Sequence, residues 1–522
     1  MRISLSFSVL TAAALLAACG GGGDGGGNNP DAPPEQIASD VCQNWSTADA
    51  VEIGVVGTEV ERADGLPTAV DAAVAVMNDC QALATWTTPT DEPGRDIVSW
   101  TAFDNSGQWI EQAVLPQSKN VHAGWGLRLR ASEDGRAVLG WMVDPESPDT
   151  PGWPRGYYAA RFELGATVGH EVEPVKLESS YPGASSDLDI LAPRGVLVTS
   201  HVKRPEASEL EVHVYARHNV TPTVIKGPVV EQPNLAVMDS YYDYDHEKLL
   251  WRSEDRDQPG AIQLKMADLS TAQAVREGRL IGRYFECTRG WVNGAGSAAE
   301  FARPWTVATS LTPYSAAAMV APTTRDIDKC PLQLIRIDHS AGGKVDSTQM
   351  TSPDTFIPVA PALVMDEHGN ALAVWKEAVD HGPSLPAKLM WSASIQGGPW
   401  STPQAIPTLA PLGSVVSRGS IALAMNGDGK AVAAVIAQDG NAQPTKEFVV
   451  YGRFDFTGGW SEWKKTADTS KLSAPKVGIN RSGAAMLVYT ATTHDLDRED
   501  GGAPDALPGD TPASRRVYAL RF

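Results

Sequence analysis

The chain has 522 residues, 63 of them acidic and 43 basic, so its formal net charge is −20. Such an acidic balance disfavours nucleic acid and anionic membrane surfaces as partners. With 48 glycines, 37 prolines and no long helical periodicity after residue 18, the composition excludes a mainly helical protein and predicts an all-β one.

The chain begins with an export signal. Residues 1–18 contain one arginine and an apolar stretch that is too short to span a bilayer. The sequence LAAC at residues 16–19 resembles the lipobox of bacterial lipoproteins. This resemblance implies cleavage before Cys19, a diacylglycerol on its sulfur and acylation of its new amino group. The alternative is an ordinary secretory signal that contains a cysteine.

Residues 19–39 form a Gly- and Pro-rich segment that cannot build a core and is predicted to be a flexible tether. Several acyl chains on Cys19 would anchor the chain firmly, since each buried methylene contributes about 0.8 kcal/mol. Gly20, rather than an aspartate, follows the cysteine. By analogy with the sorting rule of enteric bacteria, this favours the outer membrane.

From about residue 70 onward, a unit of about 58 residues recurs eight times. In each unit a polar turn leads into a short apolar strand, and glycine is expected in the turn because a tight hairpin often needs a positive φ. Three units lack the glycine, at 75–86, 238–251 and 306–320. In the other five it is Gly135, Gly195, Gly369, Gly429 and Gly483.

A second, alternating strand rich in aromatic residues follows each turn. The eight copies lie at 97–103, 157–162, 212–217, 262–268, 332–338, 388–394, 448–454 and 516–522. A Gly-Trp strand follows at 397–406, 458–466 and, more loosely, 107–114. Four short strands per unit predict an eight-bladed β-propeller, or a seven-bladed one if the fifth unit is an insertion.

The given sequence ends on the third strand of the eighth unit, so one outer strand is needed from elsewhere. Residues 44–53 (NWSTADAVEI) match the Gly-Trp strand of the sixth unit in their WST core. We therefore expect the N-terminal segment to complete the last blade and to close the ring, which would remove exposed sheet edges. A chance match over three residues is the alternative. Residues 40–522 would then form a single domain.

Four cysteines remain after Cys19, and an oxidising compartment makes disulfides the expectation. The repeat register places Cys42 and Cys80 at one end of the propeller, and Cys287 and Cys330 at the other. We predict the pairs Cys42–Cys80 and Cys287–Cys330, with the first pinning the ring closure. Each bridge would contribute roughly 3 to 4 kcal/mol in the chain-entropy model.

The loops between second and third strands should all open on one face, where propellers usually bind. Several are acidic, and the longest, residues 490–514, is strongly so. Within it, Asp495, Asp497, Glu499 and Asp500 present oxygen ligands that could hold Ca²⁺, the one cofactor that the sequence suggests. The alternative is a solvated acidic loop without a cation. By contrast, the NGDGK sequence at 426–430 is predicted to be a plain hairpin turn.

A second unusual patch replaces the glycine turn of the fourth unit with aromatic and acidic residues. They could stack on a sugar ring and bind its hydroxyls, or supply paired carboxylates for hydrolysis. The alternative is an inner strand whose tyrosines pack between blades. The candidate residues are Tyr241, Tyr242, Asp243, Asp245 and His246.

No Gly-x-Ser-x-Gly elbow or His-Glu-x-x-His pair occurs, and the repeats do not carry sialidase, kelch, WD or quinoprotein signatures. Repeats such as DEHGNALAVW (366–375) resemble those of bacterial lipoproteins with Gly-Asn-Ala-type propeller repeats, which implies a fold and a location only. We expect a non-catalytic binding or scaffold protein of the cell envelope whose acidic loop face takes an envelope protein or an extracellular polymer. The alternative is a carbohydrate-active enzyme that uses Asp243 and Asp245.

Overall fold

The computed structural model describes residues 45–143, 357–493 and 514–522 with short gaps, and between residues 156 and 349 it describes the strands alone. Every regular element in these parts is a β-strand, which confirms the all-β prediction. No helix of the described residues is long and apolar enough to cross a membrane. All the strands belong to the compact unit of residues 37–522.

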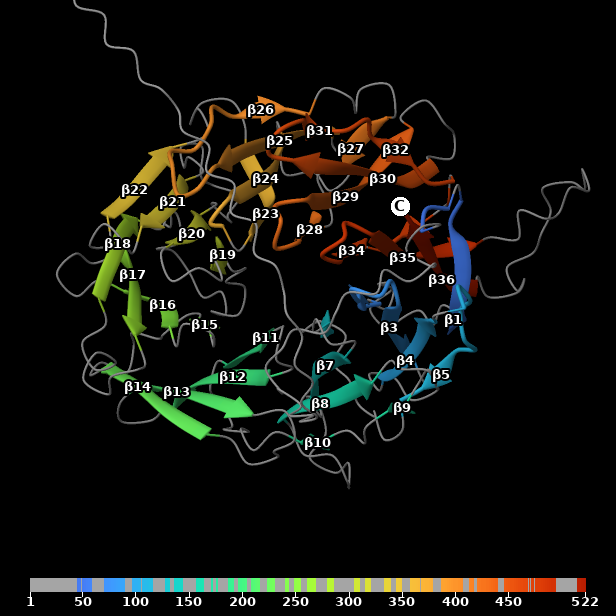
Figure 1. The fold of residues 1–522 in the computed structure, drawn as a ribbon, viewed down its shortest axis with the longest axis horizontal. Coiled ribbons are helices and arrows are strands. Elements are labelled where there is room, and N and C mark those ends of the chain that lie inside the picture. The colour runs from blue at the N-terminus through green and yellow to red at the C-terminus, as the bar shows by residue number, and fades with distance from the viewer. Residues whose placement is uncertain are drawn as a thin grey trace, which may run out of the picture. The chain divides into compact units, whose positions relative to one another are not determined.

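The strands form seven antiparallel sheets, five of which lie between residues 72 and 349 (Figure 1). Each contains a meander of sequential strands. The first sheet consists of β2 (Ala72–Val76), β3 (Ala82–Pro89), β4 (Asp96–Phe103) and β5 (Ala113–Val114). The second consists of β6 (Arg128–Ala131), β7 (Arg136–Val143), β8 (Gly156–Glu163), β9 (His170–Glu171) and β10 (Val175–Lys176). Those of the next three are β11 (Ser186–Leu191), β12 (Val196–Lys203), β13 (Ser208–Tyr215), β14 (Thr223–Val230); β15 (Ser240–Asp243), β16 (Lys248–Glu254), β17 (Ala261–Asp268), β18 (Arg279–Phe285); and β19 (Trp305–Thr309), β20 (Ser315–Val320), β21 (Gln333–Asp338), β22 (Lys344–Gln349).

The sixth sheet holds two meanders that the short strand β27 joins, because β27 pairs with both β25 and β29. Its strands are β23 (Ile357–Met365), β24 (Ala371–Ala378), β25 (Pro386–Ser394), β26 (Gln404–Ala405), β27 (Ser414–Val416), β28 (Ala422–Met425), β29 (Ala431–Asp439), β30 (Lys446–Asp455), β31 (Gly459–Trp460) and β32 (Lys464–Lys465). The seventh consists of β33 (Lys471–Leu472), β34 (Lys476–Ile479), β35 (Ala485–Thr493), β36 (Ser514–Arg521) and β1 (Val51–Thr58).

The aromatic-rich strands predicted from the sequence are the third strands of these meanders: β4, β8, β13, β17, β21, β25, β30 and β36. The Gly-Trp segments prove less regular than expected. In place of one continuous fourth strand, each contains an isolated bridge or a two-residue strand beside the third strand. The tryptophan of each segment is itself a paired residue, and Trp109 also packs against the ring of its bridge partner Phe103 at 5.4 Å.

Neighbouring meanders pack through their first strands. Strand β34 contacts β2 and β28, β2 contacts β6, β6 contacts β11, and β23 contacts β19 and β28. Along β2, alternate residues face opposite neighbours: Ala73 and Ala75 join the core with β6–β8, whereas Ala72 and Val74 join the core with β35 and β36. Small side chains on the first strands let the sheets approach closely where they converge.

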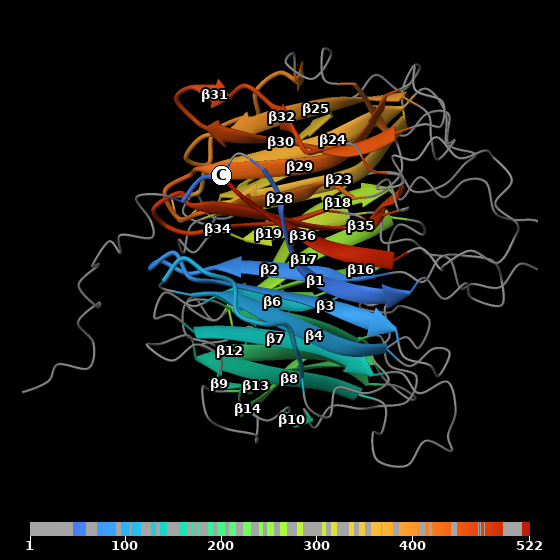
Figure 2. The same ribbon diagram turned by 90° about the vertical axis from the view of Figure 1, so that its right-hand side faces the viewer.

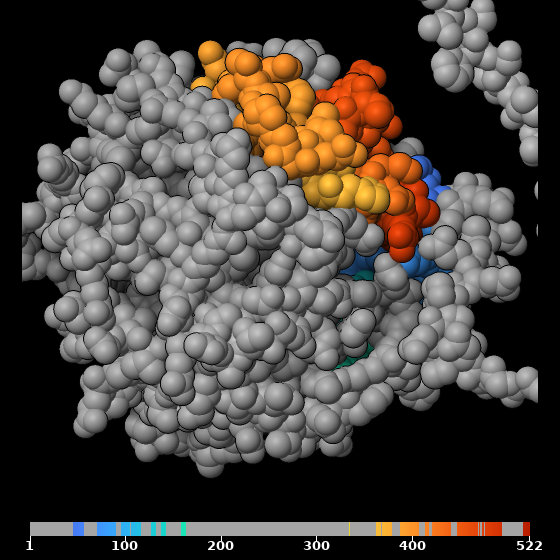
Figure 3. All heavy atoms as spheres, turned by 60° about the vertical axis from the view of Figure 1, so that its left-hand side comes forward, coloured from blue at the N-terminus to red at the C-terminus, as the bar shows by residue number. Residues whose placement is uncertain are grey.

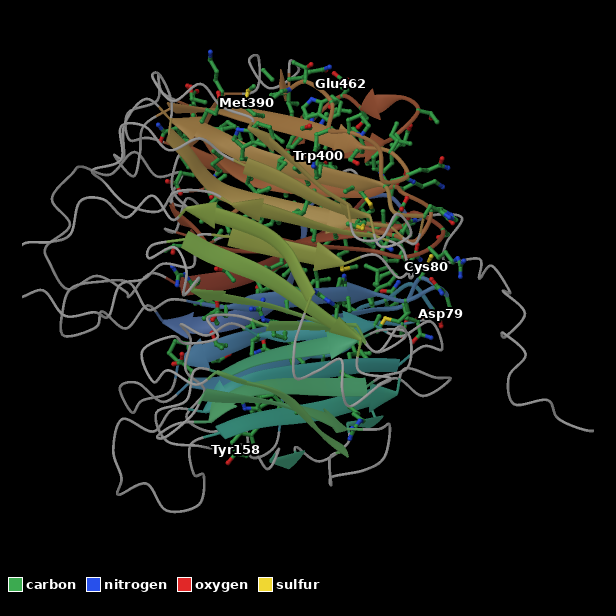
Figure 4. The ribbon with its side chains drawn as sticks, turned by 90° about the vertical axis from the view of Figure 1, so that its left-hand side faces the viewer. Asp79, Cys80, Tyr158, Met390, Trp400 and Glu462 are labelled. Atoms are coloured by element: carbon green, nitrogen blue, oxygen red, sulfur yellow. The ribbon has the colours of Figure 1, made fainter. Side chains whose placement is uncertain are left out.

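The turns between first and second strands have one recurring geometry. Gly369, Gly429 and Gly483 have φ values of 78°, 78° and 92°, and each donates its backbone N–H to the backbone oxygen of the residue three positions earlier. In the first meander Cys80 occupies the glycine's place, with φ 65°. Figure 4 shows Cys80 beside Asp79 at this end of the strands. A cysteine therefore tolerates a conformation that normally favours glycine.

We predict that, under reducing conditions, Cys80→Gly is more stable than Cys80→Ala by about 1 kcal/mol, because alanine is strained at a positive φ. Both variants lose the thiol, so the comparison isolates the backbone. Urea denaturation followed by far-UV circular dichroism measures the difference. As a matched control, Ala82→Gly in the extended strand β3 should destabilise by about 0.5 to 1 kcal/mol. Equal stabilities of the two position-80 variants would show that the turn relaxes.

Strand β1 is the outer neighbour of β36, paired antiparallel from Val51↔Ala519 to Thr58↔Ser514. The expected pairing of the N-terminal segment with the last strand is thus confirmed. In Figure 1 the blue β1 lies beside the red β36, and in Figure 3 blue atoms of the first strands lie against red ones from the C-terminal part. The strand begins at residue 51, later than the sequence match at residues 44–53 suggested.

The WST residues of that match make single anchoring contacts instead. Trp45 is 5% exposed, and its Nε1 donates to the backbone oxygen of Ala485 over 2.7 Å. The Thr47 backbone N–H donates to the oxygen of Arg521 over 2.9 Å.

The exposed edge of β1 is also capped: the Gln112 amide accepts from Val55 N at 2.8 Å and donates to Val55 O at 3.1 Å. This side chain satisfies an edge that could otherwise pair with another chain.

Candidate functional site

Most residues of the two candidate sites from the sequence lie outside the described residues. Residues 244–247, which include Asp245 and His246, connect β15 to β16 and lie outside the described residues. Tyr241, Tyr242 and Asp243 form most of β15, paired with Leu250, Leu249 and Lys248. The backbone thus has the inner-strand arrangement that was the alternative to a sugar site.

The acidic loop is at the other end of its strands. Asp495, Asp497, Glu499 and Asp500 lie outside the described residues, in the connection from β35 to β36. Connections of this kind, between second and third strands, leave each meander at the end opposite its first turn. Among the residues that the structure describes, no group of three or more His, Cys, Asp or Glu could hold a metal ion. The calcium hypothesis stays a prediction.

Of the cysteines, Cys80 is described, and it is fully buried and disulfide-bonded. Cys19, Cys42, Cys287 and Cys330 lie outside the described residues. Trp45, three residues after Cys42, belongs to the same buried cluster as Cys80. Three residues of chain span at most about 10 Å, so the predicted Cys42–Cys80 pair is compatible with this placement.

Two buried asparagines link three successive first turns among the described residues. Asn426 is 6% exposed; its Oδ1 accepts from Asp428 N at 3.1 Å and from Lys430 N at 2.9 Å within its own turn. Its Nδ2 donates to the backbone oxygens of Asn480 and Arg481, both at 3.0 Å, in the next meander's turn. The NGDGK sequence is therefore a structural turn, as predicted.

Asn480 repeats this arrangement one meander further on. Its Oδ1 accepts from Ala484 N at 2.9 Å, and its Nδ2 donates to the backbone oxygen of Met77 at 2.8 Å. It also lies 3.5 Å from the sulfur of Cys80. Each asparagine thus accepts hydrogen bonds within its own turn and donates to the backbone of the next turn. Because these polar groups are buried and hydrogen-bonded, the linked turns are rigid.

The opposite end carries charge. Lys476 is the first residue of β34, Asp71 immediately precedes β2, and Arg128 and Arg130 belong to β6. Figure 2 shows β34, β2 and β6 one below another, in agreement with their contacts. Both arginines are exposed, whereas Lys476 is partly buried. We call these four residues the mouth cluster. It lies at the end from which the second-to-third-strand loops leave.

Burial is the main reason why the pKa of Lys476 lies below its usual value. The negative charge of Asp71 raises the pKa, while the positive charges of Arg128 and Arg130 lower it further. The backbone of Asp71 is held by Thr87. The Asp71 N–H donates to Thr87 Oγ1 at 3.1 Å, and the backbone oxygen of Asp71 accepts from Thr87 N at 2.9 Å. The cluster therefore holds three cations against one anion.

Sequence reasoning missed the mouth cluster. No local motif contains it, because Asp71 and Lys476 lie some four hundred residues apart and meet only through packing of β2 on β34. A signal does exist in the repeat register. Arg128 and Lys476 each stand seven residues before a turn glycine, Gly135 and Gly483, so aligning the repeats on these glycines superimposes them, whereas Asp71 stands nine residues before Cys80.

No family model and no curated protein matches this chain. Among solved structures, similar ones include an ulvan lyase (8% identity, 91% of this chain and 96% of that one, TM-score 0.41). They also include an α-L-arabinofuranosidase from Fusarium graminearum (12%, 91% and 97%, TM-score 0.35). A third is a protein of unknown function from Dyadobacter fermentans (9%, 91% and 100%, TM-score 0.33). Likenesses at this level transfer no activity to this chain.

Proposed function

We propose that the chain is an eight-bladed β-propeller, closed by β1 in the last blade, that acts as a non-catalytic binding protein of the cell envelope. The blade count rests on eight meanders, two of which share the sheet that β27 joins. Contacts between first strands, from β34 to β2 and from β28 to β34, support the closure. A seven-bladed ring would require one of these meanders to lie outside the ring.

The observation that carries the binding role is the contrast between the two ends of the strands. One end is closed by buried asparagines that link successive turns. The other carries the mouth cluster and gives rise to the long loops, including the acidic one. A rigid scaffold that presents loops and charged side chains at one end is typical of a binding site.

Anchoring completes the proposal. The lipobox at residues 16–19 supports lipidation of Cys19, and the Gly-rich tether supports a propeller held near the outer membrane. The partner would be an envelope protein or an extracellular polymer that reaches the loop end. Charged side chains at this end would let the site discriminate among ligands by charge pattern as well as shape.

Affinity capture tests this function. The full chain, purified in detergent, is immobilised and exposed to envelope extract and to a glycan panel, with and without Ca²⁺. Replacing the acidic residues of the loop with their amides (D495N, D497N, E499Q, D500N) should abolish retention of the partner. D428N, which removes an acid at the opposite end, is the matched control and should retain it.

The carbohydrate-active alternative gives a different outcome. Cleavage of a glycan that D243N and D245N abolish, with no partner retained, would overturn the binding proposal. Loss of retention in D428N as well would also overturn it, because the acidic loop would then not be the surface that binds the partner.

A further inference from the structure

The N-terminal segment reaches the meanders at their first-turn end, the end at which first and second strands are joined. Trp45 Nε1 donates to the oxygen of Ala485, the first residue of β35, at 2.7 Å. The Thr47 N–H donates to the oxygen of Arg521, the last residue of β36. From there β1 runs toward the other end of the strands, antiparallel to β36 (Figure 2). A tether from a lipid on Cys19 therefore joins the propeller at its first-turn end.

Cys80 lies at this same end. It occupies the first turn of the first meander, where it is fully buried and disulfide-bonded. Its predicted partner, Cys42, stands three residues before Trp45, which shares a buried cluster with Cys80. A bridge between the two cysteines would fix the chain at the first-turn end a second time and would shorten the free tether to residues 20–41.

The predicted tether is short relative to the length of the strands. Residues 20–44 lie between Cys19 and Trp45, and a Gly-rich coil of this length has a root-mean-square end-to-end distance of about 25 to 30 Å. Strand β29, which has nine residues and joins the two ends, spans about 30 Å. Turning the opposite end toward the membrane would place the attachment point beyond the average reach of the tether.

The two ends also differ in bulk and charge. The described turns at the first-turn end are short, such as residues 426–430 and 480–484. At the opposite end, which we call the loop end, residues 494–513 connect β35 to β36 and contain six acidic residues against one basic residue, Arg498. A connection of this length needs room, and its charge is not attracted to an anionic membrane surface. Both differences favour the first-turn end as the one nearer to the membrane.

We propose that the first-turn end is the membrane-facing surface of the anchored protein, and that it lies against the bilayer that holds the acyl chains of Cys19. This inference rests on the proposed anchoring and deepens the proposed binding function. The loop end then faces away from that bilayer. The partner is accordingly one that approaches from the aqueous side, and not one embedded in the same membrane.

Energy transfer from a dye on the protein to acceptor-labelled lipids tests this orientation. The full chain, acylated at Cys19, is reconstituted into phosphatidylcholine vesicles, and the donor dye is attached to one introduced cysteine. D428C places the dye in the turn between β28 and β29, and K446C, the matched control, places it at the start of β30. Both positions are exposed and belong to one meander. Because the length of β29, about 30 Å, separates them, D428C should transfer energy at least about twofold more efficiently than K446C.

The other outcomes contradict the inference. Equal efficiencies would mean that the propeller lies on its side or turns freely, and a higher efficiency for K446C would mean that the loop end faces the bilayer. C19S, which cannot be acylated, should lose the transfer from both positions. Transfer that persists in C19S, or that is absent from both positions in the acylated chain, would overturn the inference together with the proposed anchoring.

The binding function and the orientation fail separately, because partner capture is measured in detergent, where no bilayer orients the protein. If capture depends on the acidic loop but K446C transfers as well as D428C or better, the orientation is wrong and the binding function stands. If D428C transfers more efficiently but no partner is retained, the orientation stands and the binding function is wrong.

Discussion

Replacing Trp45 with alanine should lower the free energy of unfolding by about 3 to 5 kcal/mol, the usual cost of deleting a buried tryptophan. The indole packs edge-on against Phe103 with ring centroids 5.7 Å apart, and it lies in one buried cluster with residues of β2, β3 and β36. The Arg521 guanidinium lies 4.3 Å from the centre of the Phe103 ring and 5.8 Å from that of Trp45. Trp45 therefore ties the N-terminal segment to both the first meander and the last one.

Trp45→Phe is the matched control for this prediction. Phenylalanine keeps most of the buried ring and loses the hydrogen bond to Ala485, whose oxygen still accepts from Phe522 N at 2.9 Å. We expect a loss of only about 1 kcal/mol. Urea unfolding followed by far-UV circular dichroism measures both variants. A loss below about 1 kcal/mol for Trp45→Ala would mean that β1 alone holds the segment and that the closure does not depend on the anchor.

The parts of the fold that could be predicted from sequence are those fixed by local chemistry that repeats. A turn glycine needs a positive φ wherever it recurs, so Gly369, Gly429 and Gly483 mark the same turn. The alternating, aromatic-rich pattern recurs in every unit, so the third strands were found within four residues of their bounds. Repetition turns weak local signals into a strong one.

What the sequence did not show depends on contacts between distant segments. The WST match at residues 44–53 correctly predicted that the N-terminal segment pairs with the last third strand. It did not predict where the pairing of β1 with β36 begins, because residues 45–47 make isolated hydrogen bonds before β1 starts. The Gly-Trp segments also differed from the continuous strands that were expected: each pairs with its third strand at the tryptophan, loses the pairing and regains it a few residues later.

The mouth cluster shows the same limit for the site. Each of its residues is an ordinary charged residue in or next to a first strand, and the residues are grouped only because the first strands of three meanders pack together. Sequence reasoning instead favoured dense local patches, such as the acidic loop and the tyrosine-rich strand. A patch is visible along the chain, whereas a site built from single residues of several repeats becomes visible only when the repeats are superimposed.

Asn480→Asp should lower the free energy of unfolding by about 2 to 4 kcal/mol at pH 7, although it changes one atom. Asn480 is 3% exposed, and its Nδ2 is the donor to Met77 O at 2.8 Å. A carboxylate there would place a buried negative charge against a carbonyl oxygen. Asp366 holds the equivalent position two meanders earlier, but there Asn370 Nδ2 donates to the carboxylate at 2.6 Å. The turn at Asn480 ends in Ala484, which offers no side-chain donor.

The pH dependence separates this electrostatic penalty from simple loss of packing. Burial raises the folded-state pKa of the new carboxyl above its unfolded value, so stability is fully present below the unfolded pKa and is lost as the pH rises through the folded pKa. A protonated carboxyl can donate to Met77 O again, so the deficit of Asn480→Asp should shrink as the pH falls from 7 toward about 4. Asp428→Asn, which changes an exposed acid in the preceding turn, should stay within about 0.5 kcal/mol throughout. A deficit that does not vary with pH would show that the asparagine acts by shape alone, and the hydrogen-bonded link between successive turns would then contribute little to the rigidity of this end.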